Sequence, residues 1–149
     1  MKSGVVLGHL KYEVNEGVIL RTAEAFGINN VFLVGGIDKS GAQGADKHLL
    51  YHRFDTYKEV CEFLVDNGFN LVVIENNDYA RNVGAMKYPI NPVFITGHEN
   101  TGIPREFVEY AKAFVRIPQS SACYVRCLNT SVAMGIVLQD FHASLRRLC

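Results

Sequence analysis

The sequence lacks any apolar run of the roughly 18 residues that a membrane-spanning helix needs. Its first residues, Met1-Lys2-Ser3-Gly4, lead into a short strand-like run and show no secretory-signal pattern. We therefore expect a cytoplasmic protein. At 149 residues, 48% of them hydrophobic, the chain is long enough for one domain (residues 1–149) with its own core, and too short for a separate recognition domain.

Net charge is also missing, because 15 Lys and Arg residues balance 15 Asp and Glu residues. Such a chain has no overall positive field that could hold nucleic acid non-specifically. Any nucleic-acid partner must therefore be bound by a local group of residues, or by a basic surface built across two chains.

No C-x-x-C pair occurs among the four cysteines Cys61, Cys123, Cys127 and Cys149. We expect reduced thiols, since the chain is no small secreted scaffold. His48 and His52 are four residues apart, a spacing that puts two ligands on one helix face, but no third ligand or general-base glutamate accompanies them. The sequence predicts no metal site.

Two nucleotide-binding signatures are absent. No G-x-G-x-x-G follows a predicted strand, which argues against a nicotinamide cofactor. The glycines of segment 97–102 have the spacing of a phosphate loop, but no Lys-Ser/Thr follows them. Glu99 inside this segment would also repel a phosphate, so a nucleoside triphosphatase is excluded.

What is present is an alternation of short apolar runs and helical patterns. Strands are predicted over residues 4–10, 31–34, 71–74, 92–97 and 113–117. Helices are predicted over residues 18–26, 45–51, 57–67, from 104 onward, and from the 129–131 cluster to 148. This order predicts an α/β fold with one mostly parallel sheet flanked by helices.

The first segment with chemical content runs from Asn15 to Gly27. Asn15 lies at the mouth of a predicted helix, and Arg21 follows about one and a half turns later among apolar neighbours. An arginine on a core-facing helix is costly without a partner, and a phosphate or carboxylate fits its planar fork. A structural salt bridge to Glu24 or Glu99 is the alternative.

Two further segments follow predicted strands. Residues 97–104 lie between a strand and a helix, where α/β proteins place ligand sites. Near the C-terminus, Ile117-Pro118-Gln119 ends a buried strand, and Asn129-Thr130-Ser131 opens a helix that leaves backbone groups free for a ligand. An ordinary helix N-cap is the alternative for this last cluster.

In this order, N-x-G-x-x-x-R-T-A-x-x-F-G, G-x-E-x-x-G-I and I-P-x…L-N-x-S-V-A resemble the three motifs of the SpoU/TrmH group of the SPOUT superfamily. Members of this group are RNA ribose 2′-O-methyltransferases, and the resemblance covers essentially the whole chain. It implies a C-terminal trefoil knot, a rare exception to unknotted folds, which forms the S-adenosylmethionine pocket. It also implies a homodimer with the active site at the interface.

The resemblance further implies roles for individual residues. Contacts with the cofactor are expected at Thr96, Gly97, Ile117, Gln119, Cys127 and Leu128. The catalytic positions are Asn15, Arg21, Glu99 and Asn129, and the RNA contacts are Arg21 and Arg126. Transfer RNA is the favoured substrate, by analogy with stand-alone members, and ribosomal RNA is the alternative.

The reaction is an in-line methyl transfer to a ribose 2′-oxygen, in which alignment supplies much of the rate. In this family the position of Arg21 is assigned to removal of the 2′-hydroxyl proton. A guanidinium keeps its own proton, with a pKa above about 12. We therefore expect Arg21 to clamp an RNA phosphate and to stabilise negative charge on the 2′-oxygen, while the phosphate or a water takes the proton.

The other polar residues have supporting roles in this hypothesis. Asn15 and Asn129 would orient Arg21 and the ribose, and Glu99 would fix its own loop or the guanidinium. Arg126 is either a phosphate contact or a solvated loop arginine.

Two features depart from the family pattern. Cys127 stands where a serine is common, and a thiol is the weaker hydrogen-bond donor. The loop from Pro118 to Cys127 is longer than usual and contains no glycine. These departures motivate a second hypothesis, a non-catalytic RNA-binding or cofactor-sensing relative of the same fold. A third is a small-molecule α/β enzyme that uses Glu99 as a base.

Overall fold

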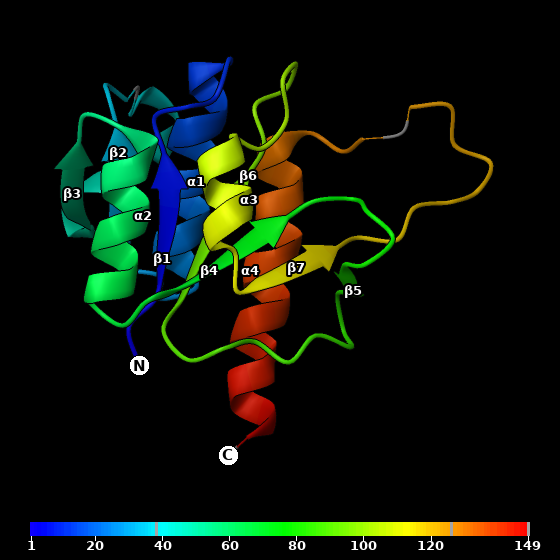
Figure 1. Cartoon of the computed structure of the whole chain (residues 1–149). Helices are drawn as coiled ribbons and strands as arrows, with labels where there is room; N and C mark the ends of the chain where they lie inside the picture. Colours follow the sequence, from blue (N-terminus) through cyan, green and yellow to red (C-terminus); the bar gives the residue numbers. More distant parts are fainter. Residues whose placement is uncertain (38, 126, 149) are drawn as a thin grey trace.

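Helices cover both faces of a parallel sheet (Figure 1). The computed structural model describes residues 1–37, 39–125 and 127–148. The strands are β1 (Gly4–Leu7), β2 (Asn30–Val34), β3 (Leu50–Phe54), β4 (Asn70–Ile74), β5 (Arg81–Asn82), β6 (Pro92–Thr96) and β7 (Ala113–Arg116). The helices are α1 (Glu13–Ala25), α2 (Tyr57–Asp66), α3 (Arg105–Tyr110) and α4 (Thr130–Arg147), with short 3₁₀ helices η1 (Ser40–Ala42) and η2 (Ala45–His48).

The seven strands lie in the order β3-β2-β1-β6-β4-β7-β5, and every pairing in the described part of the chain is parallel. Successive strand residues point to opposite faces, so the strands divide their apolar side chains between two cores. In β1, Val5 and Leu7 pack with the buried residues of α1 and α4, whereas Val6 packs with those of α2 and α3. The predicted α/β fold is confirmed.

Local sequence signals set several helix boundaries. Thr56 and Glu59 form a reciprocal capping box at the start of α2, because each side chain accepts a backbone N–H of the other residue. At the start of α4, the Asn129 side chain accepts the N–H groups of Ser131 and Val132. The N-cap expected at the 129–131 cluster is therefore present.

The helix predicted over residues 45–51 is wrong. Only Ala45–His48 are helical, in one short 3₁₀ segment, and Leu50–Phe54 form the edge strand β3. Five residues of β3 pair in register with β2, and this ladder outweighs the weak helical pattern. His52 stacks on Phe32, with ring centroids 4.8 Å apart, so it does not share a helix face with His48.

Smaller differences concern element ends. The strand predicted over residues 4–10 stops at Leu7, because Gly8 adopts a φ of 92° that turns the chain away from the sheet. The two-residue strand β5 carries no periodic pattern and was not predicted. Pro104, expected as the first residue of a helix, instead caps α3.

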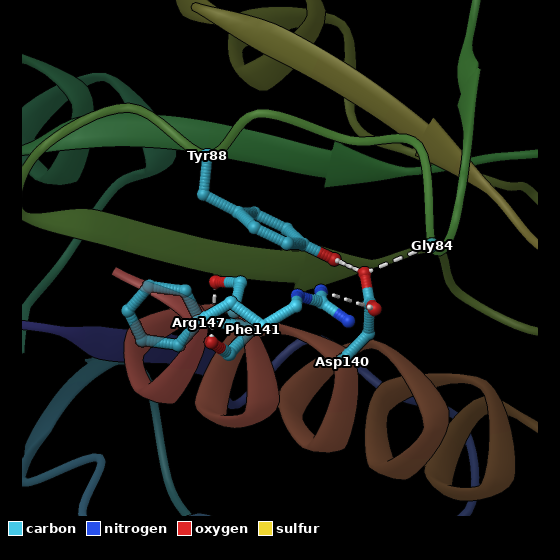
Figure 2. Close-up of polar contacts among 6 residues, drawn as sticks. Gly84, Tyr88, Asp140, Phe141 and Arg147 are labelled. Atoms are coloured by element: carbon cyan, nitrogen blue, oxygen red, sulfur yellow. Dashed lines mark hydrogen bonds and ion pairs between the residues drawn. The ribbon is translucent and has the colours of Figure 1, made fainter. Parts of the chain in front are cut away.

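Asp140 of α4 joins the closing helix to the connection between β4 and β6 (Figure 2). Its Oδ2 accepts the Tyr88 hydroxyl at 2.7 Å and the Gly84 N–H at 3.1 Å, and Arg147 lies 3.6 Å from Oδ1. Burial raises the pKa of Tyr88, and the hydrogen bond to Asp140 raises it further. Tyr88 therefore stays a hydrogen-bond donor at all physiological pH values.

Other expectations concern the whole chain. Cys61, Cys123 and Cys127 are free thiols, and Cys149 lies outside the described residues. Among the residues that the structure describes, no helix combines the length and apolar character needed to cross a membrane, and no three His, Cys, Asp or Glu side chains gather as metal ligands. The trefoil knot stays a prediction.

We expect Tyr88→Phe to lower the free energy of unfolding by about 1 to 2 kcal/mol, because it removes a hydrogen bond to a carboxylate. Urea denaturation at pH 7 would measure the change. Tyr79→Phe is the matched control, since the Tyr79 side chain is 69% exposed and its hydroxyl has no bonding partner within the described ranges. Equal stability of both variants and the wild type would contradict a stabilising role for Asp140.

Candidate functional site

A cavity of about 310 Å³ lies where β4, β6 and β7 end and α4 begins. This is the edge of a parallel sheet at which α/β proteins bind ligands, and the volume suits a small molecule. All the residues predicted to contact a cofactor line it, namely Thr96, Gly97, Ile117, Gln119, Cys127 and Leu128. The segments 96–97, 117–119 and 127–128, which are separate in the sequence, therefore meet at one cavity.

The cavity wall has features that suit a ligand with polar atoms. Thr96 is buried, and its hydroxyl has no hydrogen-bond partner within the described residues. At Gly97 a Cβ atom would come within 2.8 Å of the Gly102 carbonyl carbon, so only glycine allows this closure of the 97–102 loop. His98 and Gly102 exchange backbone hydrogen bonds at 2.9 Å and hold the loop closed.

A chain of amide hydrogen bonds runs along one side of the cavity. Asn129 Nδ2 donates to Asn15 Oδ1 at 3.2 Å, and Asn15 Nδ2 donates to Glu99 Oε1 at 2.9 Å. Because a carboxylate only accepts, Glu99 fixes the orientation of the Asn15 amide and, through it, that of Asn129. The three motifs are therefore joined by direct contacts.

Glu99 gathers two more donors. The Lys11 N–H donates to Oε2 at 2.8 Å, and the Thr130 hydroxyl donates to Oε1 at 3.3 Å. Burial alone would raise the pKa of Glu99, but hydrogen bonds from its own backbone, Lys11, Asn15 and Thr130 outweigh burial and lower it. Glu99 is therefore ionised at neutral pH and acts as an acceptor.

Asn129 combines both roles considered for it. Its Oδ1 accepts the Ser131 N–H at 2.9 Å and the Val132 N–H at 3.3 Å as a helix cap, and its side chain also lines the cavity. The cap leaves Nδ2 to donate to Asn15. Helix capping thus positions the amide for the site.

The sequence suggested that Arg21 lies on the core-facing side of α1. The structure places it on the exposed side. Its side chain is exposed, follows Val14 and Val18 along one helix stripe, and does not line the cavity. Neither Glu24 nor Glu99 forms an ion pair with it in the described structure. The prediction that this side chain faces the core is therefore wrong, and the guanidinium has no acidic partner among the described residues.

The loop after β7 extends away from the body of the molecule (Figure 1). Tyr124 in this loop is fully exposed, and Gln119 Nε2 donates to the Val125 carbonyl at 3.4 Å. Gln119 and Cys127 therefore reach the cavity from the two ends of a projecting loop. Arg126 lies outside the described residues.

Several residues at the site were not predicted. Glu75, Asn76 and Arg116 line the cavity, and Arg116 is held by Asn82 Oδ1 at 2.7 Å and by the Asn77 carbonyl at 3.3 Å. The position of Arg116 directly before Ile117 at the end of a strand could have indicated it. The Lys11 contact is made by backbone, which no side-chain pattern reveals.

Glu16 is buried in α1 beside the loop that follows β1. Its Oε1 accepts the Leu10 N–H at 3.2 Å, and the Gly8 N–H also favours the charged form of the carboxylate. Burial raises the pKa of Glu16 to about 7, and the charges of Glu13 and Glu99 act in the same direction. Glu16 therefore changes charge near neutral pH.

A parallel sheet with a cavity at the ends of its central strands, bordered by a polar chain of hydrogen bonds, defines a ligand-binding α/β domain. The SpoU rRNA Methylase family model matches residues 2–139. The chain belongs to this family.

A Staphylococcus saprophyticus protein assigned to the TrmH family of tRNA/rRNA methyltransferases is 29% identical over 147 residues. The alignment covers 91% of this chain and 56% of that relative, so the chain spans about half the length of the curated relatives that it matches.

Solved structures agree on the fold. The SpoU methyltransferase AviRb of Streptomyces viridochromogenes, solved in complex with AdoMet, matches with a TM-score of 0.85 at 19% identity, over 97% of this chain and 58% of AviRb. A structure concerned with 2-OH methylation of C/U34 on tRNA matches with a TM-score of 0.78 at 20% identity, over 98% of this chain and 97% of that one. The fold is that of the SPOUT methyltransferases.

Glu16→Gln should stabilise the protein at pH 8 but not at pH 5. The pKa of about 7 in the folded chain lies above the ordinary 4.5, so the folded state keeps a proton that the unfolded state loses. Stability from this group is therefore greatest below pH 4.5 and falls as the pH rises to 7. The amide removes this loss, so its advantage at pH 8 should reach about 2 to 3 kcal/mol.

Urea denaturation of both proteins at pH 5 and pH 8 would measure the difference. Glu13→Gln, in the exposed part of the same helix turn, controls for the loss of one negative charge. A gain that is the same at both pH values would show that Glu16 does not retain a proton on folding.

Proposed function

We propose that this protein is an S-adenosylmethionine-dependent RNA methyltransferase that modifies a ribose 2′-oxygen. One observation carries the proposal. The residues expected to bind the cofactor line one cavity, and Asn129 and Glu99 stand on its wall, joined through Asn15. The family match supports the same class of reaction.

When bound, S-adenosylmethionine supplies a methyl group on a positively charged sulfur. The apolar residues Ile117 and Leu128 offer a surface for the adenosyl group, and the Thr96 hydroxyl offers an unused hydrogen bond. Gln119 and Cys127 border the opening. The Glu99 carboxylate, ionised at neutral pH, adds negative charge to the cavity wall, which would favour a positively charged sulfur.

Arg21, Asn15 and Asn129 would act on the RNA. In this proposal Arg21 binds an RNA phosphate and stabilises the negative charge that develops on the 2′-oxygen, and the phosphate or a water takes the proton. Asn129 orients the ribose, and Asn15 keeps Asn129 in place. Arg126 adds a second phosphate contact.

Transfer RNA is the proposed substrate, and ribosomal RNA is the alternative. The structure concerned with tRNA methylation is matched over 97% of its own chain, whereas AviRb is matched over 58% of its own chain, and this difference supports tRNA.

A homodimer is the proposed form, since Arg21 is displayed outward and not into the cavity of its own chain. Exposed apolar residues surround it and the start of α4, namely Val14, Val18, Leu128, Val132 and Ile136. A second copy packed here would cover these residues and could bring its Arg21 to the cavity of the first chain. Sedimentation analysis would show a monomer if this proposal is wrong.

The other two hypotheses fare differently. Cys127 borders the cavity with an exposed thiol, so a cofactor-binding relative without turnover remains the competing proposal. A small-molecule enzyme with Glu99 as base is disfavoured, because hydrogen bonds that lower the pKa of a carboxylate make it a weaker base.

Incubation with total RNA and methyl-labelled S-adenosylmethionine should label RNA at a ribose 2′-oxygen, and mapping should place the label in tRNA. Digestion to nucleosides followed by mass spectrometry would locate the methyl group. S-adenosylhomocysteine binding without any labelling would favour the non-catalytic relative, and labelled rRNA would favour the alternative substrate.

Arg21→Ala should lower the rate of methyl transfer by about a hundredfold or more, because charge on the 2′-oxygen loses its partner. S-adenosylhomocysteine affinity, measured by calorimetry, should change little, since Arg21 does not line the cavity. Arg146→Ala is the matched control, as Arg146 is exposed in the last turn of α4. Full activity of Arg21→Ala would exclude the proposed role.

A further inference from the structure

Glu16 is the most deeply buried charged side chain in the described structure, with 2% of its surface exposed. Its Oε1 accepts the Leu10 N–H, but Oε2 has no partner among the described residues. A buried carboxyl oxygen without a hydrogen bond costs about 1 to 3 kcal/mol, so an apolar residue at this position would be the stable choice. The presence of a glutamate here calls for a role.

Its contacts show what Glu16 holds. The loop between β1 and α1, residues 8–12, contains N–H groups that lie outside the strand and the helix, and Glu16 accepts that of Leu10. The Gly8 N–H also favours the charged form of the carboxylate. At Gly8 a Cβ atom would lie 2.3 Å from the Val34 carbonyl oxygen, so the loop begins in close contact with β2. The carboxyl group therefore fixes the loop from the helix side.

The same loop contacts the cavity wall twice. His9 Nε2 donates to the Thr96 carbonyl at 2.7 Å, and burial lowers the pKa of His9, so its ring is neutral. The next contact is the Lys11 N–H, which donates to Glu99 Oε2 at 2.8 Å. The Leu10 N–H thus donates to Glu16, which does not line the cavity, and the neighbouring Lys11 N–H donates to Glu99, which does.

We propose that Glu16 is a positioning residue of this site, which holds residues 8–11 so that the Lys11 N–H and the His9 ring keep Glu99 and Thr96 in place. Through Glu99 the effect extends to the Asn15 amide, which bonds to its other oxygen. Glu16 does not line the cavity. The inference rests on the proposed function only for its activity readout.

The charge state of Glu16 is coupled to the site. The ionisable groups whose charge acts on it are Glu13 in its own helix and Glu99 in the loop after β6, and the β1–α1 loop presents backbone N–H groups. With its pKa raised to about 7, Glu16 is neutral in mild acid and adds a negative charge behind Glu99 at higher pH. The wild-type pH profile should therefore contain a step that originates at Glu16.

The test compares Glu16→Gln, which keeps an acceptor for the Leu10 N–H, with Glu16→Leu, which does not. Glu13→Gln is the charge control. We expect Glu16→Leu to lower kcat by about tenfold or more with KM for S-adenosylmethionine nearly unchanged, because misplaced polar groups affect the reacting geometry. Glu16→Gln should keep kcat within about threefold and lack the step near pH 7.

Amide hydrogen exchange measures the positioning without any need for turnover. Exchange at Leu10 and Lys11 should become at least about tenfold faster in Glu16→Leu and stay near wild type in Glu16→Gln. If Glu16→Leu does not fold, the pH profile and the exchange rates of Glu16→Gln still test the proposal. Unchanged exchange in a folded Glu16→Leu, or a step near pH 7 that persists in Glu16→Gln, would overturn it.

The proposed function and the positioning role of Glu16 can be refuted independently of each other. A wild type that methylates no RNA refutes the proposed function, while the exchange rates still report whether Glu16 holds the loop. An active wild type whose Glu16→Leu variant has normal kcat and normal exchange refutes only the positioning role.

Discussion

The negative charge of Glu99 is the interaction on which the rest of the site depends. It draws hydrogen bonds from the β1–α1 loop, from α1 and from α4, through Lys11, Asn15 and Thr130. A neutral carboxyl group would have to donate at one oxygen, and one of these donors would then lose its partner. The ionised carboxylate therefore holds the β1–α1 loop, α1 and α4 together. It also sets the orientation of the Asn15 and Asn129 side-chain amides.

Helix α1 serves the core and the site with different faces. Ile19, Leu20 and Ala23 are fully buried against the sheet and α4, while Val14 and Arg21 remain exposed. The first turns add Asn15 and Glu16, which are polar and buried. One helix thus anchors the fold, orients Glu99 and displays a cation, which explains why its sequence departs from an ordinary amphipathic pattern.

The alternation of strands and helices was sufficient to predict the parallel sheet, and the resemblance to the SpoU/TrmH motifs implied a cofactor pocket with Asn15, Glu99 and Asn129 as site residues. The direct hydrogen bonds among these three side chains were not predicted. The sequence did not reveal the exposure of Arg21, since apolar neighbours at Val14 and Val18 resemble a core stripe until the packing of the helix is known. Strand β3 was missed because its stability comes from pairing with β2. Backbone donors such as Lys11 N–H leave no trace in a side-chain pattern.

The hydrogen bond between Asn15 and Asn129 joins residues 114 positions apart. The contact that completes the site therefore closes a loop that contains most of the chain, and it forms only when α4 has been synthesised and docked. In a nascent or C-terminally truncated chain that lacks α4, Asn15 has no Asn129 partner and the polar site remains open. Ligand binding would then favour the complete fold over shorter forms, and the site would report whether the chain has finished folding.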